Sequence, residues 1–161
     1  MTIPLHLDGS PLSIQDVLQV ARQARPVSLS PTALAAITRA RAVVENAMAD
    51  GLPHYGINTG FGSLSRQRIG EADLRTLQQN LLRSHSAGVG TPLPRDVVRG
   101  MMVLLAASLA RGCSGVRPIV VERLVSLLNA GVTPRVPTTG SVGASGDLAP
   151  LAALGLVLTG E

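Results

Sequence analysis

The sequence predicts a mainly α-helical fold with one short N-terminal strand and glycine-rich loops. Hydrophobic residues make up 45% of the 161 residues, which is typical of a globular chain and excludes a disordered one. The apolar residues gather in segments of helical length that begin at capping residues or proline and end at glycine. By its length, we expect residues 1–161 to form one domain, and the sequence contains no internal repeat.

Each predicted element follows from local signals. Residues 3–10 are expected to form a short strand or an extended arm. Ser13 opens the first helix with Asp16 at the capping-box position, and Ser30 opens the second as a cap directly before Pro31. Glycine ends several helices, because it adopts the left-handed conformation beyond the C-cap without strain. The expected helices span residues 13–24, 30–50, 72–87, 94–111, 118–130 and 148–159, with a loop at 52–70 and an extended stretch at 133–137.

Composition disfavours several classes of function. The formal charge is +4, and all 14 basic residues are arginines that are scattered singly, which disfavours nucleic-acid binding. The absence of lysine excludes a lysine Schiff base within these residues. Cys113 is the only cysteine, so we expect no internal disulfide and no thiolate metal site, as suits a reducing cytoplasm. No signal peptide is recognisable, and the apolar stretches Met101–Ala110 and Leu148–Leu158 are too short to span a bilayer.

The two aromatic residues of the chain, Tyr55 and Phe61, fall in one glycine-rich segment, His54–Gly62 (HYGINTGFG). The rest of the chain builds its predicted core from Leu, Val and Ala. The concentration of aromatic residues in one loop makes this segment a candidate functional site.

The segment Gly140–Ala152 (GSVGASGDLAPLA) joins a glycine-rich turn to the last predicted helix. Ser145 or Asp147 could cap that helix, and Pro150 suits its first turn. The spacing excludes a nucleophile elbow, because glycine follows Ser145 directly, and the absence of lysine excludes a phosphate-binding loop. The residues by themselves leave the chemistry of this turn open.

The last predicted helix, at 148–159, is apolar nearly all round, as is typical of a helix that is buried on every side. No later residues of this chain cover it, and the helices at 94–111 and 118–130 raise the same difficulty. We therefore expect residues 1–161 to be the first domain of a larger helical protein. A compact bundle in which the helices cover each other, or an oligomer, would also bury them.

Four segments together resemble the aromatic amino acid ammonia-lyases, and among these the histidine ammonia-lyases most closely. They are Tyr55–Gly62 (YGINTGFG), Ser84–Gly90 (SHSAGVG), Arg111–Arg117 (RGCSGVR) and Gly140–Leu151 (GSVGASGDLAPL). The resemblance spans most of the chain in matching order and implies the helical ammonia-lyase/fumarase-like fold. Members of the family are several times longer and form homotetramers whose active sites draw on several subunits. The resemblance therefore implies an N-terminal domain that is inactive alone and whose ring can remain unformed.

The resemblance also implies that Ala144-Ser145-Gly146 closes into 4-methylidene-imidazole-5-one (MIO), a built-in electrophile that requires no metal. The backbone nitrogen of Gly146 would attack the carbonyl of Ala144 with loss of two waters, and Ser145 would supply the methylidene carbon. Glycine leaves its nitrogen unobstructed. Gly143 would let the chain bend sharply, and Asp147 could relay protons during closure.

The same resemblance assigns roles outside the turn. Tyr55 would be the general base that removes the β-proton of the substrate. Because a phenol is protonated at neutral pH, this role requires nearby positive charge or helix N-termini. Gly62 would donate a backbone contact to the substrate, and Ser84 with His85 would select it, since an imidazole can hydrogen-bond a histidine substrate. The implied reaction converts L-histidine to urocanate and ammonia.

Two other interpretations stay open. A tyrosine- or phenylalanine-specific lyase, or a 2,3-aminomutase, would use the same ring. Ala153 stands where histidine ammonia-lyases usually carry histidine, and Thr139 stands where a basic residue is usual, which leaves the substrate open. A non-catalytic helical interaction module would keep the fold without turnover.

Overall fold

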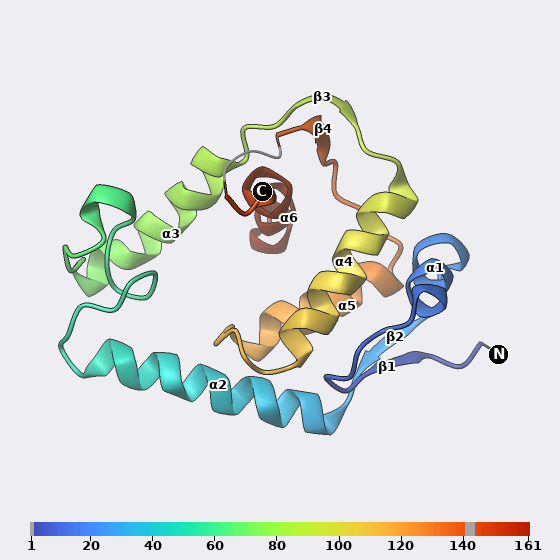
Figure 1. Cartoon of the computed structure of the whole chain (residues 1–161), viewed down its shortest axis with the longest axis horizontal. Helices are drawn as coiled ribbons and strands as arrows, with labels where there is room; N and C mark the ends of the chain where they lie inside the picture. Colours follow the sequence, from blue (N-terminus) through green and yellow to red (C-terminus); the bar gives the residue numbers. More distant parts are fainter. Residues whose placement is uncertain (1, 141–143) are drawn as a thin grey trace.

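The computed structural model describes residues 2–140 and 144–161 and is mainly α-helical within them, as predicted (Figure 1). Residues 141–143, which include Gly143 of the expected bend, lie outside the described residues. The helices are α1 (Ile14–Gln23), α2 (Pro31–Ala49), α3 (Glu71–His85), α4 (Arg95–Ala110), α5 (Pro118–Asn129) and α6 (Leu148–Thr159), with a 3-10 turn at Gly62–Leu64. The strands are β1 (Leu5–Leu7), β2 (Val27–Leu29), β3 (Val89–Pro92) and β4 (Pro137–Thr139).

The helix ends confirm the local signals in the sequence. Ser13 and Asp16 form a complete capping box at the start of α1. Ser30 caps α2 through the backbone N–H of Ala33, with Pro31 in the first turn. The predicted helix bounds agree with the observed ones to within two residues, because the caps that set them are local.

The four short strands pair in two separate ribbons. β1 pairs with β2 in parallel, and β3 pairs with β4 in the antiparallel direction. The sequence predicted an arm at β1 and an extended stretch near β4 but missed β2 and β3. Strands of three or four residues are too short to show the alternating pattern that identifies a strand.

The hydrophobic core is centred on α4, which packs against α1, α2 and α5 (Figure 1). Six apolar side chains of α4 are buried, and Val121, Leu124 and Leu128 of α5 face them within the same cluster. The two helices lie side by side and cover each other on one face, as in the compact-bundle alternative. The expectation that they lack full cover holds for their other faces, where Val97 and Leu104 of α4 and Ile119 of α5 are 45%, 52% and 45% exposed.

Helix α6 behaves as predicted. It is apolar on all sides, but only Ala152 and Leu154 are buried, and Leu148 is 49% exposed. It packs mainly against α3, where a side chain at Gly155 would lie only 2.7 Å from Leu82. Arg83 of α3 forms a bidentate ion pair with the carboxylate of Glu161, in which both N–O distances are 2.8 Å. This last contact lowers the pKa of the Glu161 carboxyl, chiefly through the hydrogen bond from Arg83.

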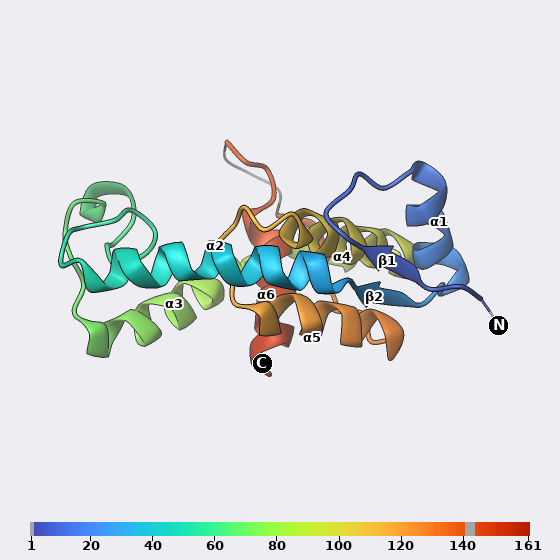
Figure 2. The same cartoon turned by 90° about the horizontal axis from the view of Figure 1, so that it is seen from below.

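The loop Arg111–Arg117, one of the four resembling segments, packs against α2. Gly112 and Gly115 both have positive φ angles, 68° and 67°. A Cβ atom at Gly112 would lie 2.6 Å from the backbone of Ala36, and one at Gly115 would collide with Val44. These two glycines let the loop approach α2 closely. Helix α2 runs from the core to the loop that carries Tyr55 (Figure 2).

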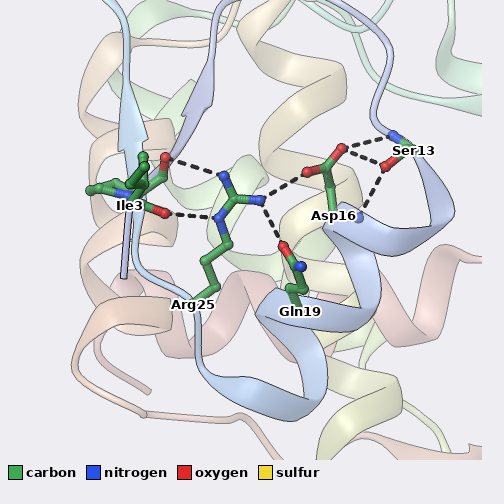
Figure 3. A network of polar contacts seen from close by, with 6 residues as sticks. Ile3, Ser13, Asp16, Gln19 and Arg25 are labelled. Carbon is green, nitrogen blue, oxygen red and sulfur yellow. Dashed lines mark hydrogen bonds and ion pairs between the residues drawn. The ribbon is translucent and has the colours of Figure 1, made fainter. Parts of the chain in front are cut away.

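A polar network fixes the N-terminal arm to α1 (Figure 3). The guanidinium of Arg25 donates to the backbone oxygen of Ile3, to Asp16 and to Gln19, at 2.9, 2.9 and 2.8 Å. Hydrogen bonds from Ser13, together with Arg25, hold the pKa of the Asp16 carboxyl below its ordinary value. One arginine therefore connects the N-terminal arm before β1 to Asp16 and Gln19 of α1.

Arg99 of α4 is buried, with 3% of its surface exposed. It donates two hydrogen bonds to the carbonyl of Val20, at 2.9 and 3.2 Å, and one to the carbonyl of Leu128, at 3.0 Å. These carbonyls lie in the last turns of α1 and α5, where a cation is favourable for the helix dipole. Burial, with a smaller contribution from Arg95, lowers the pKa of Arg99, which stays charged because arginine titrates far above neutral pH.

We expect Arg99→Met to destabilise the protein by about 1–3 kcal/mol, because it removes three buried hydrogen bonds, two of them to the carbonyl of Val20. Thermal or urea unfolding measures this loss. Arg22→Met is the matched control, since Arg22 also contacts α4, through Asp96, but is 65% exposed. The control should change stability by less than about 1 kcal/mol, and equal losses in the two variants would contradict the prediction.

Candidate functional site

The segment Ala144–Asp147 forms an exposed turn between β4 and α6. Gly146 has a φ of 72°, a left-handed conformation that glycine adopts without strain. Ala144 and Ser145 are exposed, so no packed side chain blocks their backbone. Asp147 occupies the N-cap position of α6, but its carboxylate makes no capping hydrogen bond, contrary to the capping interpretation. A small, exposed turn with a left-handed glycine is compatible with closure of the backbone on itself.

The segment Ser84–Gly90 lies against the base of this turn, through close contacts between glycines. A Cβ atom at Gly140 would lie 2.9 Å from Cα of Gly88 and 3.2 Å from Cβ of Ala149. A Cβ atom at Gly88 would lie 3.1 Å from Pro137, and Val89 pairs with Thr139 in the β3–β4 ribbon. Two of the resembling segments, distant in sequence, therefore meet in space.

His85 is the last residue of α3 and is half-buried. Its Nδ1 lies 2.9 Å from the carbonyl oxygen of Leu81 and 3.1 Å from the Ser84 hydroxyl, which itself donates to the Leu81 carbonyl at 3.0 Å. Because a carbonyl oxygen only accepts, Nδ1 carries the proton. In the neutral ring Nε2 is then an acceptor, and the helix backbone fixes the orientation of the imidazole.

The loop that carries Tyr55 is organised by Asn58, which is only 2% exposed. The side-chain oxygen of Asn58 accepts from the backbone N–H of His54 at 2.7 Å, and its amide donates to the carbonyl of Leu52 at 2.8 Å. The backbone carbonyl of Asn58 accepts from Ile69 at 2.8 Å. These bonds close the turn on which Tyr55 stands.

Tyr55 projects from this turn with 66% of its surface exposed. Its ring meets Phe61 edge-on, with 5.8 Å between the ring centroids. Gly62 is exposed, with a φ of 58°, and begins the 3-10 turn. Both residues face outward from the loop rather than into the core of this chain.

The candidate residues therefore form two groups at opposite ends of α3 (Figures 1 and 2). Tyr55 and Gly62 lie before its first residue, whereas Ser84 and His85 end it, in the segment that contacts Gly140 through Gly88. The helix has 15 residues, which at a rise of about 1.5 Å each separates its ends by about 22 Å. Within this chain, the structure does not bring Tyr55 to Ala144-Ser145-Gly146.

The sequence profile of the family "Aromatic amino acid lyase" matches residues 12–161. The chain belongs to the aromatic amino acid lyase family. It is 54% identical over 157 residues to a histidine ammonia-lyase of Koribacter versatilis, covering 98% of this chain and 30% of that protein. The chain thus spans about 30% of the length of the curated relatives it matches.

The solved structures place this lyase-family chain within the same fold. A tyrosine aminomutase from Streptomyces globisporus matches with a TM-score of 0.90 and 36% identity, over 99% of this chain and 30% of that one. A histidine ammonia-lyase from Trypanosoma cruzi matches with a TM-score of 0.84 and 38% identity, over 96% of this chain and 29% of that one. The expected fold is confirmed.

Two cavities of this lyase-family chain lie away from the predicted catalytic residues. One, of about 340 Å³, lies between the end of α2 and the start of α3, and another, of about 440 Å³, lies between α5 and α6. Their linings contain Asn58, Arg68 and Arg123 but none of the candidate residues. Among residues 2–140 and 144–161, no three His, Cys, Asp or Glu side chains gather as metal ligands, and no helix is long and apolar enough to cross a membrane.

Sequence reasoning missed the residues that hold the candidate site in shape. Asn58 lies inside a resembling segment, and an asparagine within a glycine-rich turn is itself a signal for side-chain bonds to the backbone. His54 and Asp50, which form a hydrogen bond at 2.8 Å, carried no such signal. The structure alone shows that they meet at the base of the loop.

Proposed function

We propose that this chain is the N-terminal domain of a longer ammonia-lyase that acts on L-histidine and releases urocanate and ammonia. The similarity to histidine ammonia-lyases, at about half of all positions over nearly the whole chain, supports the reaction class. The observation that carries the choice of substrate is His85. Its Nε2 is an oriented acceptor at the end of α3, in the segment that contacts Gly140 through Gly88, and it suits an imidazole N–H of the substrate.

We propose that the electrophile forms from the chain itself. The nitrogen of Gly146 bonds to the carbonyl carbon of Ala144, whose oxygen leaves as one water with the N–H protons of Gly146 and Ser145, while a C=N bond forms to the Ser145 nitrogen. Ser145 loses its hydroxyl and its α-proton as the second water, which creates the methylidene group. The left-handed Gly146 and the exposed Ala144 favour this approach, and Asp147, whose carboxylate is not engaged in capping, can carry protons during it.

In the elimination of ammonia, each candidate residue of this chain has a separate role. Once formed, MIO supplies an electrophilic carbon that makes the substrate amine a better leaving group. Tyr55 removes the β-proton as general base. Gly62 binds the substrate through its backbone, and Ser84 with His85 selects it. The Leu81 carbonyl holds the tautomer of His85 that accepts from the substrate ring. Tyr55 and the turn lie at opposite ends of α3, so we propose that the protein is a homotetramer in which different subunits supply them to one active site. We place this tetramer in the cytoplasm, which suits a sequence with a single cysteine.

The runner-up is a 2,3-aminomutase or a lyase acting on tyrosine or phenylalanine. The high similarity in fold to a tyrosine aminomutase supports it. An aminomutase returns the ammonia to the β-carbon, so its product is a β-amino acid rather than an unsaturated acid.

Two measurements on the full-length protein test the proposed function. We expect release of urocanate from L-histidine, with slower or no turnover of tyrosine and phenylalanine, in an absorbance assay combined with product analysis. We also expect the intact mass to lie below that of the sequence by two water molecules. A β-amino acid product would favour the aminomutase, and an undiminished mass in an active protein would rule out the ring.

A further inference from the structure

His54 directly precedes Tyr55 and is tied to the end of α2. Its Nε2 lies 2.8 Å from a carboxylate oxygen of Asp50, the C-cap residue of that helix. About one third of the His54 side chain is exposed. The imidazole therefore connects the residue before Tyr55 to a regular element rather than to another part of the loop.

Asp50 is held in place to receive this bond. Its other carboxylate oxygen accepts from the backbone N–H of Leu52 at 2.8 Å. The pKa of the Asp50 carboxyl is lowered, first by this hydrogen bond, then by His54 and by the charge of Arg68. An ionised carboxylate only accepts, so Nε2 of His54 carries the proton and donates whether the ring is neutral or charged.

The backbone of His54 takes part in a second anchor. Its N–H donates to the side chain of buried Asn58, and its carbonyl accepts from the N–H groups of Ile57 and Asn58 at 3.0 and 3.2 Å. The side chain of Tyr55 has no comparable restraint, since its described neighbour is the edge of Phe61 and most of its surface is exposed. The direction of Tyr55 is thus set by the backbone next to it, and His54 fixes that backbone.

We propose that His54 is a positioning residue for Tyr55, acting through its hydrogen bond to Asp50 at the end of α2. This inference rests on the proposed function, in which Tyr55 is the general base. A base must lie within hydrogen-bond reach of the proton that it removes, and a displacement of about 1 Å is enough to cost about a hundredfold in rate. Loss of the His54–Asp50 bond should therefore lower kcat more than it raises KM.

The experiment compares variants of the full-length protein in the histidine assay. We expect His54→Leu to lower kcat by about tenfold to a hundredfold, with KM changed by less than about threefold. His54→Gln should restore most of kcat, because its amide can donate to Asp50 from the same region. The double variant His54→Leu with Asp50→Ala should be no slower than Asp50→Ala alone, since His54 acts through Asp50. His6→Leu is the matched control, because His6 also makes one exposed hydrogen bond, to Ser28 at 2.7 Å, far from the loop.

The possible outcomes separate failure of the proposed function from failure of the positioning role of His54. An inactive wild-type protein would overturn the proposed function and this inference together. If the wild type is active and Tyr55→Phe is not, wild-type kcat in His54→Leu would overturn the positioning role alone. A fall in kcat that matches a fall in the unfolding temperature, with no rescue by His54→Gln, would assign His54 to stability and also overturn it. Fully additive effects of the two substitutions would show that His54 does not act through Asp50.

Discussion

Ser145→Ala in the full-length protein is expected to reduce turnover to background while leaving the fold intact. In the proposed ring only Ser145 supplies the methylidene carbon, and alanine has no hydroxyl to lose. The side chain is exposed in a turn, so its removal leaves no cavity in the core. The activity assay, the unfolding temperature and the intact mass together measure the effect.

The mass gives this prediction its control. The variant should keep the full mass of its sequence, whereas the active wild type should lack two water molecules. Ser108→Ala is the matched substitution, since Ser108 is an exposed serine on α4, and it should leave both activity and mass loss unchanged. Turnover by a correctly folded Ser145→Ala protein would rule out the ring mechanism.

The helices were predictable because caps, prolines and glycines mark their ends, and these residues lie within four positions of the helix end that they mark. The capping box at Ser13 and Asp16 is such a signal. Long-range polar contacts carry no such mark. Arg99 reaches a carbonyl 79 residues away, and Asn129 makes a pair of hydrogen bonds with the backbone of Val27, 102 residues away. Nothing in the local sequence distinguishes these side chains from exposed ones.

The fate of the apolar helices shows a related limit. Composition alone could not say whether α4 and α5 face each other or await other partners. The structure pairs them, because their apolar faces form one cluster with Val20 of α1 and Val136. Cover is still incomplete, since Val97 and Leu104 of α4 and Ile119 of α5 are 45%, 52% and 45% exposed. Helix α6, which is apolar on every side, is covered only in part by α3 and α5.

The sequence predicted which segments belong to the candidate site but not how they are arranged in space. Resemblance selected Tyr55, His85 and the turn at Ala144–Asp147. The structure adds the reason that two segments meet, the contact of Gly88 with Gly140, and it shows that the loop before α3, which carries Tyr55, lies apart from them. It also shows how the Tyr55 loop is held, through Asn58 and the His54–Asp50 bond.

Tyr55→Phe is expected to lose most of the rate with little loss of stability. The substitution removes only the hydroxyl, and the edge contact with Phe61 survives. Loss of a general base costs about 10²–10⁴-fold in rate, or roughly 3–5 kcal/mol of barrier. Steady-state kinetics on histidine measure it, and a loss of less than about threefold would assign the base to another residue. The matched control is Phe61→Leu, which alters the neighbouring ring while keeping the hydroxyl.

Mixing the two inactive variants tests whether Tyr55 and the ring meet across subunits. If one subunit supplies Tyr55 and another supplies the turn, a hybrid oligomer contains some sites with an intact tyrosine and an intact serine. Equal amounts of Tyr55→Phe and Ser145→Ala chains, refolded or coexpressed together, should then recover up to about a quarter of wild-type activity, since each half of a site is intact in half of the subunits. If both residues come from one chain, every site lacks one of them and the mixture stays inactive. An inactive mixture would mean that Tyr55 reaches the turn of its own chain. Either α3 would then have to bend, or the Tyr55 loop would have to fold back along α3, and the structure shows neither arrangement.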